Sequence, residues 1–380
     1  MLNNWPGCQN ILCIRADNLG DLLMSSPAIL ALKETFSCKI TVLTSSMATG
    51  IARFIPQIDD VITYDLPWVK ANETVPPENF LTIIDLLKEK QFDAAIIFTV
   101  YSQSSMPAAM LAYMAQIPLR LAYCRENPYG LLTDWLPEVE PYEMVRHQVR
   151  RDLDLVSSIG AKSSDEKISI VLPYHVWPHV EAKLQKAGID INKPWIILHA
   201  GVSEIKREYP VPLWVITGKK LVGDLNQQVL LTGVQSEKSL TDHLESQIGR
   251  GAFSLGGLFT LEEFLVLINH ASLVISVNTG TIHIAAATST PVLVLYALTN
   301  PQHLPWKVPG KVLLFDIPKE LRSKNQVIKY VHENLIIPIV DMASPDDVLA
   351  AARQLLQEGR NGKVLPEVIP LRKKVEQPTS

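Results

Sequence analysis

Asp21 is the first side chain whose type and position suggest chemistry. It follows a short apolar run at residues 11–14 and precedes a helical pattern that continues to Phe36. Gly20 lets the chain turn tightly, which places Asp21 at the carboxyl end of a predicted strand. An ionised carboxylate at that place is suited to act as a general base. Helix capping is the alternative role for the same carboxylate.

A second candidate is the polar turn at residues 278–281, which reads Asn-Thr-Gly-Thr. It lies between an apolar run at 273–277 and a short helical pattern of small residues. Backbone N–H groups at a helix start, together with the hydroxyls of Thr279 and Thr281, suit a pyrophosphate. His283 follows about one helical turn later. A single histidine on a helix is more often structural, and contact with a ligand is its alternative role.

A third candidate follows the apolar run at residues 195–198. Gly201 and Ser203 come at the end of this run, and two adjacent cations, Lys206 and Arg207, come after them. Cations at such a place can neutralise phosphate charge, and arginine can do so through two parallel hydrogen bonds. The alternative is a solvated charged loop, which is the usual meaning of a short Lys-Arg pair.

The elements that must position these residues are clearest in residues 264–306, which contain no Asp, Glu, Lys or Arg. A stretch of this kind indicates either a membrane span or the core of a sheet. The turn at 278–281 and Pro291 interrupt it, so no uninterrupted segment reaches the roughly 18–20 apolar residues that cross a bilayer. Its alternation of strand and helix patterns predicts a βαβ unit with buried parallel strands.

The same alternation recurs along the chain and predicts an α/β fold with two Rossmann-like doubly wound domains. The first helix is expected to begin at Pro27, with Ser26 as its N-cap. Residues 160–180 are expected to form a loop between the domains. Strands are predicted at residues 11–14, 39–43, 61–64, 93–98, 119–122, 195–198, 228–231, 253–255, 273–277 and 292–296. Further helices are predicted at residues 80–90, 106–115, 147–159, 214–221, 237–248, 260–269, 281–288 and 346–357.

Length and composition fit this organisation. The chain has 380 residues, of which 47% are hydrophobic and 19% charged, as expected of a globular protein with two domains. We predict an N-terminal domain at residues 1–175, a C-terminal domain at 176–345, and a final helix with a polar tail at 346–380. The net charge of −4 gives no electrostatic case for nucleic acid as the main partner.

Cysteine usage and the N-terminus bear on the compartment. The four cysteines contain no CxxC pair, which is typical of reduced thiols rather than a disulfide framework or a zinc site. The first ten residues lack the basic-then-apolar order of a signal peptide. We therefore expect a cytoplasmic protein, and a peripheral contact with the inner face of the cytoplasmic membrane stays open.

Several familiar motifs are absent or misleading. No GxGxxG, GxxxxGK[ST] or GxSxG pattern is present, and the histidines show no metal-ligand spacing. Asp152 and Asp154 form the Asp-x-Asp pattern of a metal-binding sugar-nucleotide site. They fall within a helical pattern, so we expect both on the surface. No metal and no cofactor are expected.

The three candidate loops together resemble glycosyltransferase family 9, the bacterial heptosyltransferases that build the lipopolysaccharide core. The resemblance covers residues 10–310. It is carried by residues 14–21 (IRADNLGD) with 26–28 (SPA), by 199–203 (HAGVS) with 207–210 (REYP) and Trp214, and by 277–287 (VNTGTIHIAAA) with Pro291. Two residues depart from the family pattern: Asn278 stands where the family has Asp, and Arg207 where it has Lys, with Lys206 adjacent.

The resemblance implies a GT-B architecture, two domains facing across a cleft, and an inverting, metal-independent transfer from a nucleotide-diphosphate sugar. ADP-heptose is the typical donor, and the acceptor is a lipid-linked or core oligosaccharide of lipopolysaccharide or a related glycan. Asp21 corresponds to the proposed catalytic base. Donor binding is predicted for Ser203, Lys206, Arg207, Glu237, Asn278, Thr279, Gly280, Thr281 and His283, and acceptor binding for Arg120 and Arg125.

Two alternatives stay open. The first is a catalytically degenerate protein of the same fold that binds a nucleotide-sugar without turnover, an interpretation that rests on Asn278. The second is a nucleotide-sugar dehydrogenase or epimerase, which the missing GxGxxG pattern disfavours. Consumption of the donor separates the first alternative from a transferase, and a bound nicotinamide would favour the second.

Overall fold

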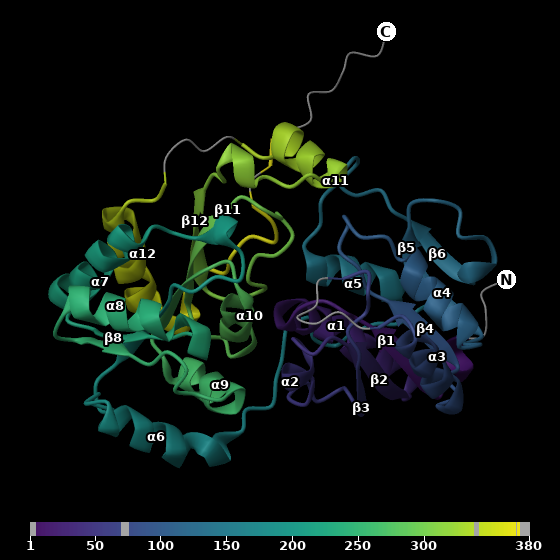
Figure 1. Cartoon of the computed structure of the whole chain (residues 1–380), viewed down its shortest axis with the longest axis horizontal. Helices are drawn as coiled ribbons and strands as arrows, with labels where there is room; N and C mark the ends of the chain where they lie inside the picture. Colours follow the sequence, from purple (N-terminus) through teal and green to yellow (C-terminus); the bar gives the residue numbers. More distant parts are fainter. Residues whose placement is uncertain (1–4, 70–75, 338–341, 370, 373–380) are drawn as a thin grey trace, which may run out of the picture. The chain divides into compact units, whose positions relative to one another are not determined.

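The computed structural model describes residues 5–69, 76–337, 342–369 and 371–372, and divides the chain into two compact units, Met1–Val171 and Leu172–Ser380 (Figure 1). Each unit is a parallel six-stranded sheet with helices packed on it. Among the described residues, no helix combines the length and hydrophobicity that crossing a membrane requires.

The sheet of the first unit has the strand order β3-β2-β1-β4-β5-β6, and all its pairs are parallel. Its central strands are short apolar runs, buried on both faces as parallel strands in this fold class are. The strands are β1 (Asn10–Ile14), β2 (Lys39–Thr44), β3 (Asp60–Thr63), β4 (Ala94–Ile97), β5 (Leu119–Cys124) and β6 (Asp134–Pro137). The helices are α1 (Leu19–Phe36), α2 (Thr49–Ala52), α3 (Asn79–Glu89), α4 (Met106–Met114) and α5 (Gln148–Ser157).

Helix α1 begins at Leu19 and includes Pro27, so the predicted start at Pro27 is wrong. Proline has no N–H to offer the carbonyl of Leu23, four residues earlier. The hydroxyl of Ser26 donates to that carbonyl instead, at 2.7 Å. Ser26 therefore compensates the proline within the helix rather than capping its start.

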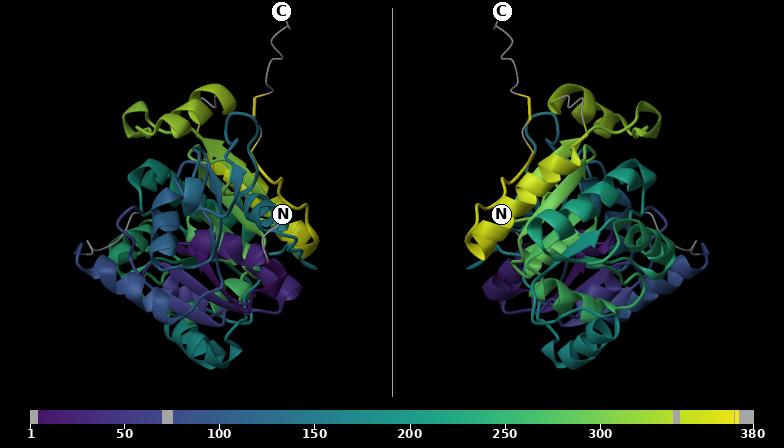
Figure 2. Two further views of the ribbon diagram at one scale, coloured as in Figure 1. Left: turned by 90° about the vertical axis from the view of Figure 1, so that its right-hand side faces the viewer. Right: turned by 90° about the vertical axis from the view of Figure 1, so that its left-hand side faces the viewer.

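The second unit repeats the same topology with the order β12-β11-β10-β7-β8-β9. In both units the first strand of that unit, β1 or β7, lies inside the sheet. Its strands are β7 (Trp195–His199), β8 (Gln228–Leu231), β9 (Ala252–Ser254), β10 (Leu273–Val277), β11 (Val292–Ala297) and β12 (Gly310–Phe315). Its helices are α6 (Trp177–Lys186), α7 (Val211–Leu225), α8 (Lys238–Ile248), α9 (Leu261–His270), α10 (Gly280–Ala287), α11 (Gln326–Tyr330) and α12 (Pro345–Glu358). Helix α12, yellow in Figure 2, packs against α7 and β11.

The predicted α/β class with two Rossmann-like doubly wound units is confirmed. The missed elements include β6, β12, α6 and the short helix α11. β6 (DWLP) is a short edge strand with half-buried and exposed side chains, and it lacks the apolar run that identifies a buried strand. β12 is also an edge strand; its apolar run at residues 312–315 was overlooked. α6 lies where a linking loop was expected, although Pro178 in its first turn is a helix-start signal. In the predicted polar tail, Leu365 and Ile369 are buried; residues 370 and 373–380 lie outside the described residues.

Candidate active site

Each sheet has one place where the strand order reverses, and the candidate residues gather there. In the first unit this switch point lies between β1 and β4, and in the second between β7 and β10. Doubly wound sheets bind ligands beyond the carboxyl ends of their strands at such points. Residues 15–21 follow β1, and residues 278–281 follow β10. The fold therefore brings the predicted loops to the expected edge of each sheet.

Asp21 lies in the first turn of α1, where it both caps the helix and meets a cation. Its Oδ2 accepts a hydrogen bond from the backbone N–H of Asn18, the N-cap, at 3.2 Å. Its Oδ1 accepts one from Nη2 of Arg15 at 3.1 Å. The capping role is thus present in the structure. The same contacts hold the carboxylate at the switch point in a fixed orientation.

Arg15 is fully buried and serves more than one carboxylate. Its Nε lies 3.4 Å from Oδ2 of Asp17, and its Nη2 contacts Asp21. Burial alone would lower the pKa of Arg15, but Asp17, Asp21 and Asp152 together raise it. For Asp17, burial raises the pKa, and the charge of Arg15 opposes that change. Sequence reasoning missed Arg15, although burial of the last residue after an apolar strand was a usable signal.

Asp152 is 1% exposed, so its predicted surface location is wrong. It lies on the face of α5 that packs against α1. Its two carboxylate oxygens accept hydrogen bonds from Oγ of Ser25 at 2.7 Å and from Nε2 of Gln148 at 2.8 Å. Burial raises the pKa of Asp152 to about 6, while Arg15 and the two hydrogen bonds act in the opposite direction.

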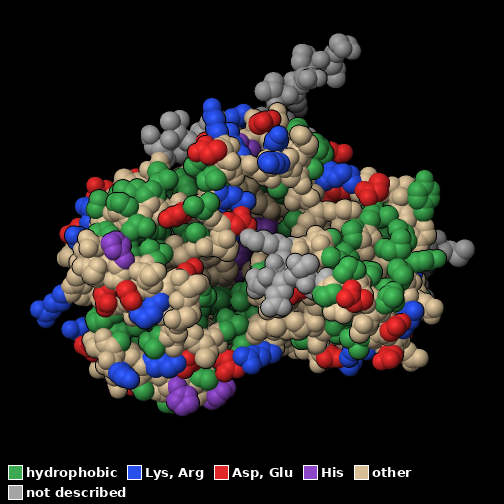
Figure 3. Space-filling model, viewed as in Figure 1, with side chains coloured by type: hydrophobic (Ala, Val, Ile, Leu, Met, Phe, Trp, Pro, Cys, Tyr) green, Lys and Arg blue, Asp and Glu red, His purple; other side chains and the backbone are tan. Residues whose placement is uncertain are grey.

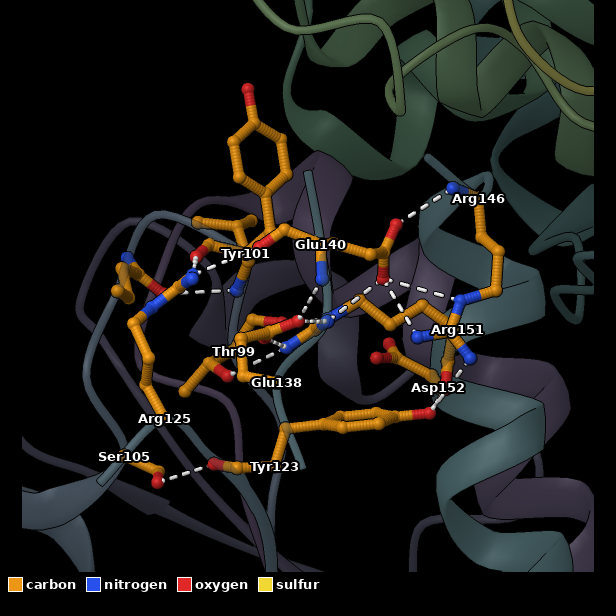
Figure 4. Close-up of polar contacts among 12 residues, drawn as sticks. Thr99, Tyr101, Ser105, Tyr123, Arg125, Glu138, Glu140, Arg146, Arg151 and Asp152 are labelled. Atoms are coloured by element: carbon orange, nitrogen blue, oxygen red, sulfur yellow. Dashed lines mark hydrogen bonds and ion pairs between the residues drawn. The ribbon is translucent and has the colours of Figure 1, made fainter. Parts of the chain in front are cut away.

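A buried ion-pair network next to Asp152 holds the chain after β4 (Figure 4). Nη1 of Arg151 contacts carboxylate oxygens of Glu138 and Glu140, each at 2.9 Å, and its Nη2 donates to Glu138. Its Nε donates to the carbonyl of Thr99 at 3.0 Å, and its guanidinium lies 4.2 Å from the ring centroid of Tyr123. This network fixes Thr99 at the switch point. Nothing in the sequence singled it out.

Arg120 and Arg125, predicted to bind the acceptor, both donate to backbone carbonyls. Arg120 donates from Nε to Leu131 at 2.8 Å and from Nη2 to Gly130 at 2.9 Å. Arg125 donates from Nη2 to Tyr101 at 2.8 Å and to Glu140 at 2.9 Å (Figure 4). These contacts give both side chains a part in holding loops of the first unit. Their role in acceptor binding stays a prediction.

In the second unit, the predicted cations share one carboxylate. Nζ of Lys206 lies 2.6 Å from Glu204, and Nη2 of Arg207 lies 3.7 Å from the other oxygen of the same carboxylate. All three side chains are about 26–30% exposed. Ion pairs exposed to this extent contribute little to stability, so an incoming anion can replace Glu204 at small cost. Ser203, in the same loop, is exposed.

Glu237 lies against two glycines that leave room for it. A Cβ added at Gly201 would be 2.1 Å from the carboxyl carbon of Glu237, and one at Gly233 would be 2.7 Å from its Oε2. Oε2 accepts the backbone N–H of Val234 at 2.9 Å. Nearby, Nδ1 of His199 lies 3.1 Å from Oγ1 of Thr232, and burial lowers the pKa of His199 while Glu237 opposes this. The structure thus brings the end of β7 and Glu237 together.

Asn278 is 6% exposed, and its side chain ties β10 to the end of β11. Its Oδ1 accepts the N–H of Ala297 at 3.2 Å, and its Nδ2 donates to Oγ1 of Thr299 at 3.0 Å. Its backbone carbonyl accepts from Nη1 of Arg207 at 3.1 Å. The predicted donor residues Asn278 and Arg207 are therefore in direct contact, 71 positions apart in the sequence.

The remaining predicted donor residues surround the start of α10. Thr279 is the N-cap of this eight-residue helix, and Gly280 and Thr281 form its first turn. Thr281 and His283 are each 5% exposed. Backbone N–H groups of the first turn have no partners within the helix, which makes this end able to receive an anion. Among the described residues, no group of three or more His, Cys, Asp or Glu side chains is placed to hold a metal ion.

The family follows from comparison with known proteins. The model of glycosyltransferase family 9 (heptosyltransferase) matches residues 81–330, which is more than half of the chain. This chain belongs to glycosyltransferase family 9. It is accordingly a glycosyltransferase of the heptosyltransferase family of lipopolysaccharide core biosynthesis.

The relatives described next have low sequence identity to this chain, but each aligns with it over almost its whole length. The lipopolysaccharide heptosyltransferase 3 of Escherichia coli is 22% identical and aligns over 91% of this chain and 99% of its own length. Among solved structures, a family 9 glycosyltransferase of Veillonella parvula has a TM-score of 0.72 at 16% identity, covering 92% and 97% of the two chains. The E. coli ADP-heptose lps heptosyltransferase II has a TM-score of 0.69 at 18% identity, covering 92% and 99%. The GT-B architecture is shared with these structures.

Proposed function

We propose that this family 9 enzyme transfers a heptose from ADP-heptose to a hydroxyl of a saccharide acceptor, with inversion at the anomeric carbon and with Asp21 as the base. The observation that carries the proposal is the position of Asp21. Its carboxylate lies at the switch point of the first unit, oriented by the N–H of Asn18 and by Arg15. The name of one solved relative, the E. coli ADP-heptose lps heptosyltransferase II, supports ADP-heptose as the donor.

In the proposed reaction, Asp21 accepts the proton of the acceptor hydroxyl. The oxygen attacks the anomeric carbon from the face opposite the diphosphate, the new C–O bond forms, and the bond to the diphosphate oxygen breaks with its electron pair. The nucleoside diphosphate leaves, and the anomeric configuration inverts. An ordinary carboxylate suffices for this role because the proton can be transferred late in the step.

We propose that the second unit binds the donor and stabilises the leaving diphosphate. Lys206 and Arg207 supply positive charge once they exchange Glu204 for phosphate oxygens. The N–H groups at the start of α10 and the hydroxyls of Thr279 and Thr281 add further donors. Positive charge and oriented dipoles of this kind perform what a metal ion does in other glycosyltransferases, which supports a metal-independent reaction.

Asn278 and Glu237 bear on the donor sugar and nucleotide. The side chain of Asn278 bonds to Ala297 and Thr299, an arrangement in which an aspartate would place a negative charge beside Arg207. Because Asn278 is neutral, it does not offset the positive charge of Arg207, which can then bind the diphosphate. The carboxylate of Glu237 lies against Gly201 and Gly233, which supports a role in accepting hydrogen bonds from ribose hydroxyls. Both assignments are part of the proposal.

We further propose a peripheral contact with the membrane that carries a lipid-linked acceptor. Figure 3 shows hydrophobic side chains gathered over α3 and α4 of the first unit. Amphipathic aromatic and apolar side chains on a surface favour the interfacial region of a bilayer. Retention on sedimented lipid vesicles, lost when Leu81 and Met110 are replaced by serine, would support this contact. The exposed side chains are Leu81, Leu86, Met110, Tyr113 and Met114.

The central test is Asp21→Asn. The amide keeps the size of the side chain and can still accept the N–H of Asn18, but it is not a base. We expect transfer to fall about 10²- to 10⁴-fold, the usual contribution of general base catalysis. Binding of ADP-heptose, measured by calorimetry, should change less than about threefold because the donor residues lie in the second unit. Asp85→Asn, at an exposed site, is the matched control.

Retained turnover in Asp21→Asn would disprove the base assignment. A protein that binds ADP-heptose but never consumes it, with any acceptor offered, would support the degenerate alternative. Asn278 is the residue that keeps this alternative in view, since it departs from the family pattern at the donor site.

A further inference from the structure

A cavity of about 260 Å³ lies within the first unit, beyond the carboxyl ends of β1 and β4. Asp17 enters it from the chain after β1, and a polar stretch after β4 forms another part of its wall. Trp68 and Val69 line it from the chain after β3. The polar stretch consists of Thr99, Ser102, Gln103 and Ser104. Ala16 and Asp17 belong to the first candidate loop, but the sequence did not indicate the cavity that they line.

The polar groups of the cavity are held in place by the protein. Nε2 of Gln103 donates to Oδ1 of Asp17 at 2.6 Å, while its Oε1 accepts the N–H of Val100 at 3.2 Å. Oδ2 of Asp17 lies 3.4 Å from Nε of the buried Arg15. Arg151 holds the carbonyl of Thr99. A site whose side chains are fixed in this way loses little conformational entropy when a ligand binds.

The mixture of walls suits one sugar ring. A pyranose has hydroxyls around its edge and C–H groups on its faces, so it needs hydrogen-bond acceptors on one side and an apolar or aromatic surface on the other. Asp17, Gln103 and the serine hydroxyls supply the first. Trp68, set edge-on to Phe80 with ring centroids 5.9 Å apart, supplies the second. The volume lies just under the roughly 300 Å³ at which pockets for drug-sized ligands begin.

The negative charge of the cavity favours neutral sugars over acidic ones. Of the described residues that line it, Asp17 alone is charged. A sugar acid or a phosphorylated sugar would bring a second negative charge close to this carboxylate, and the described residues that line the cavity include no cation to offset it. Like charges placed together in a poorly solvated site repel strongly. A neutral sugar instead donates its hydroxyls to the carboxylate.

We propose that this cavity binds a neutral, hydroxyl-rich sugar residue of the acceptor, and that Asp17 selects it by accepting its hydroxyls and rejecting acidic sugars. The identification of the ligand as the acceptor rests on the function proposed above. Asp17 and Asp21 contact the same guanidinium of Arg15, so a sugar bound at Asp17 lies next to the catalytic base. Asp17 is then a specificity-determining residue, separate from the base.

The test uses two probes that differ only at C6, methyl α-glucopyranoside and methyl α-glucopyranosiduronic acid. Their binding to the full-length protein is titrated by NMR at pH 7.5. We expect the neutral glycoside to bind at least 10-fold more tightly. Asp17→Asn should weaken the neutral glycoside about 10- to 100-fold, the range for a lost hydrogen bond to a charged group, and should abolish the discrimination. Trp68→Leu should weaken both probes without changing their ratio.

Asp85→Asn, an exposed carboxylate of the same unit, should leave both titrations unchanged. Equal or tighter binding of the acidic probe by the native protein would overturn the proposal. A preference for the neutral probe that survives in a folded Asp17→Asn variant, as judged by circular dichroism, would also overturn it. If Asp17→Asn does not fold, unchanged binding of both probes by Trp68→Leu would decide against the cavity. Because these are binding measurements, they stand apart from turnover. If turnover of Asp21→Asn disproved the base assignment, the binding results would still stand. If the binding results overturned the cavity proposal, the base assignment would still stand.

Discussion

Replacement of Asp152 by asparagine should stabilise the first unit at neutral pH. The asparagine oxygen can accept from Gln148, and its amide can donate to Oγ of Ser25, which still donates to the carbonyl of Asp21 at 3.2 Å. The substitution therefore keeps both hydrogen-bonded neighbours and removes only the charge. Asp152 is 1% exposed, so this charge is held away from water.

The magnitude follows from the pKa of Asp152, which burial raises from 3.8 to about 6. The difference of about 2.2 pKa units corresponds to about 3 kcal/mol at 1.36 kcal/mol per unit. Below pH 4 the carboxyl is protonated in the folded and the unfolded chain, and no penalty exists. Between about pH 4 and 6 the unfolded chain loses the proton first, so the folded chain binds more protons and its stability falls as pH rises. Above pH 6 the penalty is complete.

Hydrogen exchange of peptides from α1 and α5 measures this effect, because the two helices pack on each other and open together. At pH 8, Asp152→Asn should exchange roughly 100-fold more slowly than the native protein in these peptides, as about 3 kcal/mol requires. The advantage should shrink toward zero near pH 4. Asp85→Asn should change protection by less than about 0.5 kcal/mol. A difference that does not vary with pH, or a variant less protected at pH 8, would refute the reasoning.

Other substitutions test the remaining contacts. Arg151→Met leaves the buried carboxylate of Glu138 without its cation and leaves Glu140 paired with Arg146 alone. It should lower the unfolding free energy by about 3–5 kcal/mol, visible in urea titrations. Gly201→Ala displaces Glu237 and should weaken ADP binding about 10-fold in calorimetry. Gly223→Ala has open space around its added Cβ, so it should bind ADP normally. Its free energy of unfolding should rise by about 0.5–1 kcal/mol, measured by thermal unfolding. Thr260→Ala removes a capping box and should cost about 1 kcal/mol by the same measurement. Unchanged values for Arg151→Met, Gly201→Ala or Thr260→Ala would contradict the corresponding contact.

The sheets could be predicted because each central strand is recognisable from its own short stretch of sequence. β1, β7, β10 and β11 are apolar runs bounded by polar turns, and burial on both faces is all that such a run requires. The turns after them were predicted for the same reason, since a chain that leaves a buried strand must reach the edge of the sheet. The edge strand β6 (DWLP) lacks that signal because its side chains alternate between half-buried and exposed.

The surroundings of Asp21 could not be predicted, because they depend on contacts between distant residues. The hydrogen bond from Ser25 to Asp152 joins positions 127 apart, and the one from Arg151 to Thr99 joins positions 52 apart. The helical period places Asp152 on a face of α5 but does not reveal what covers that face. Local pattern thus identified the candidate base, whereas its buried partners required the tertiary structure.

The two units carry opposite charge at equivalent points of the same fold, and the partners of these charges explain how each can act. Arg15 is fully buried, so it stays with Asp21 and holds the carboxylate in one orientation. Glu204 is about 30% exposed and pairs with Lys206 and Arg207 only until a better anion arrives. In the proposed mechanism, Lys206 and Arg207 placed in the loop of Asp21 would pair with the proposed base in addition to Arg15, and the carboxylate would then compete with the diphosphate for them. Placing base and cations on separate sheets, each with a counter-charge of suitable burial, lets one chain hold both before substrates bind.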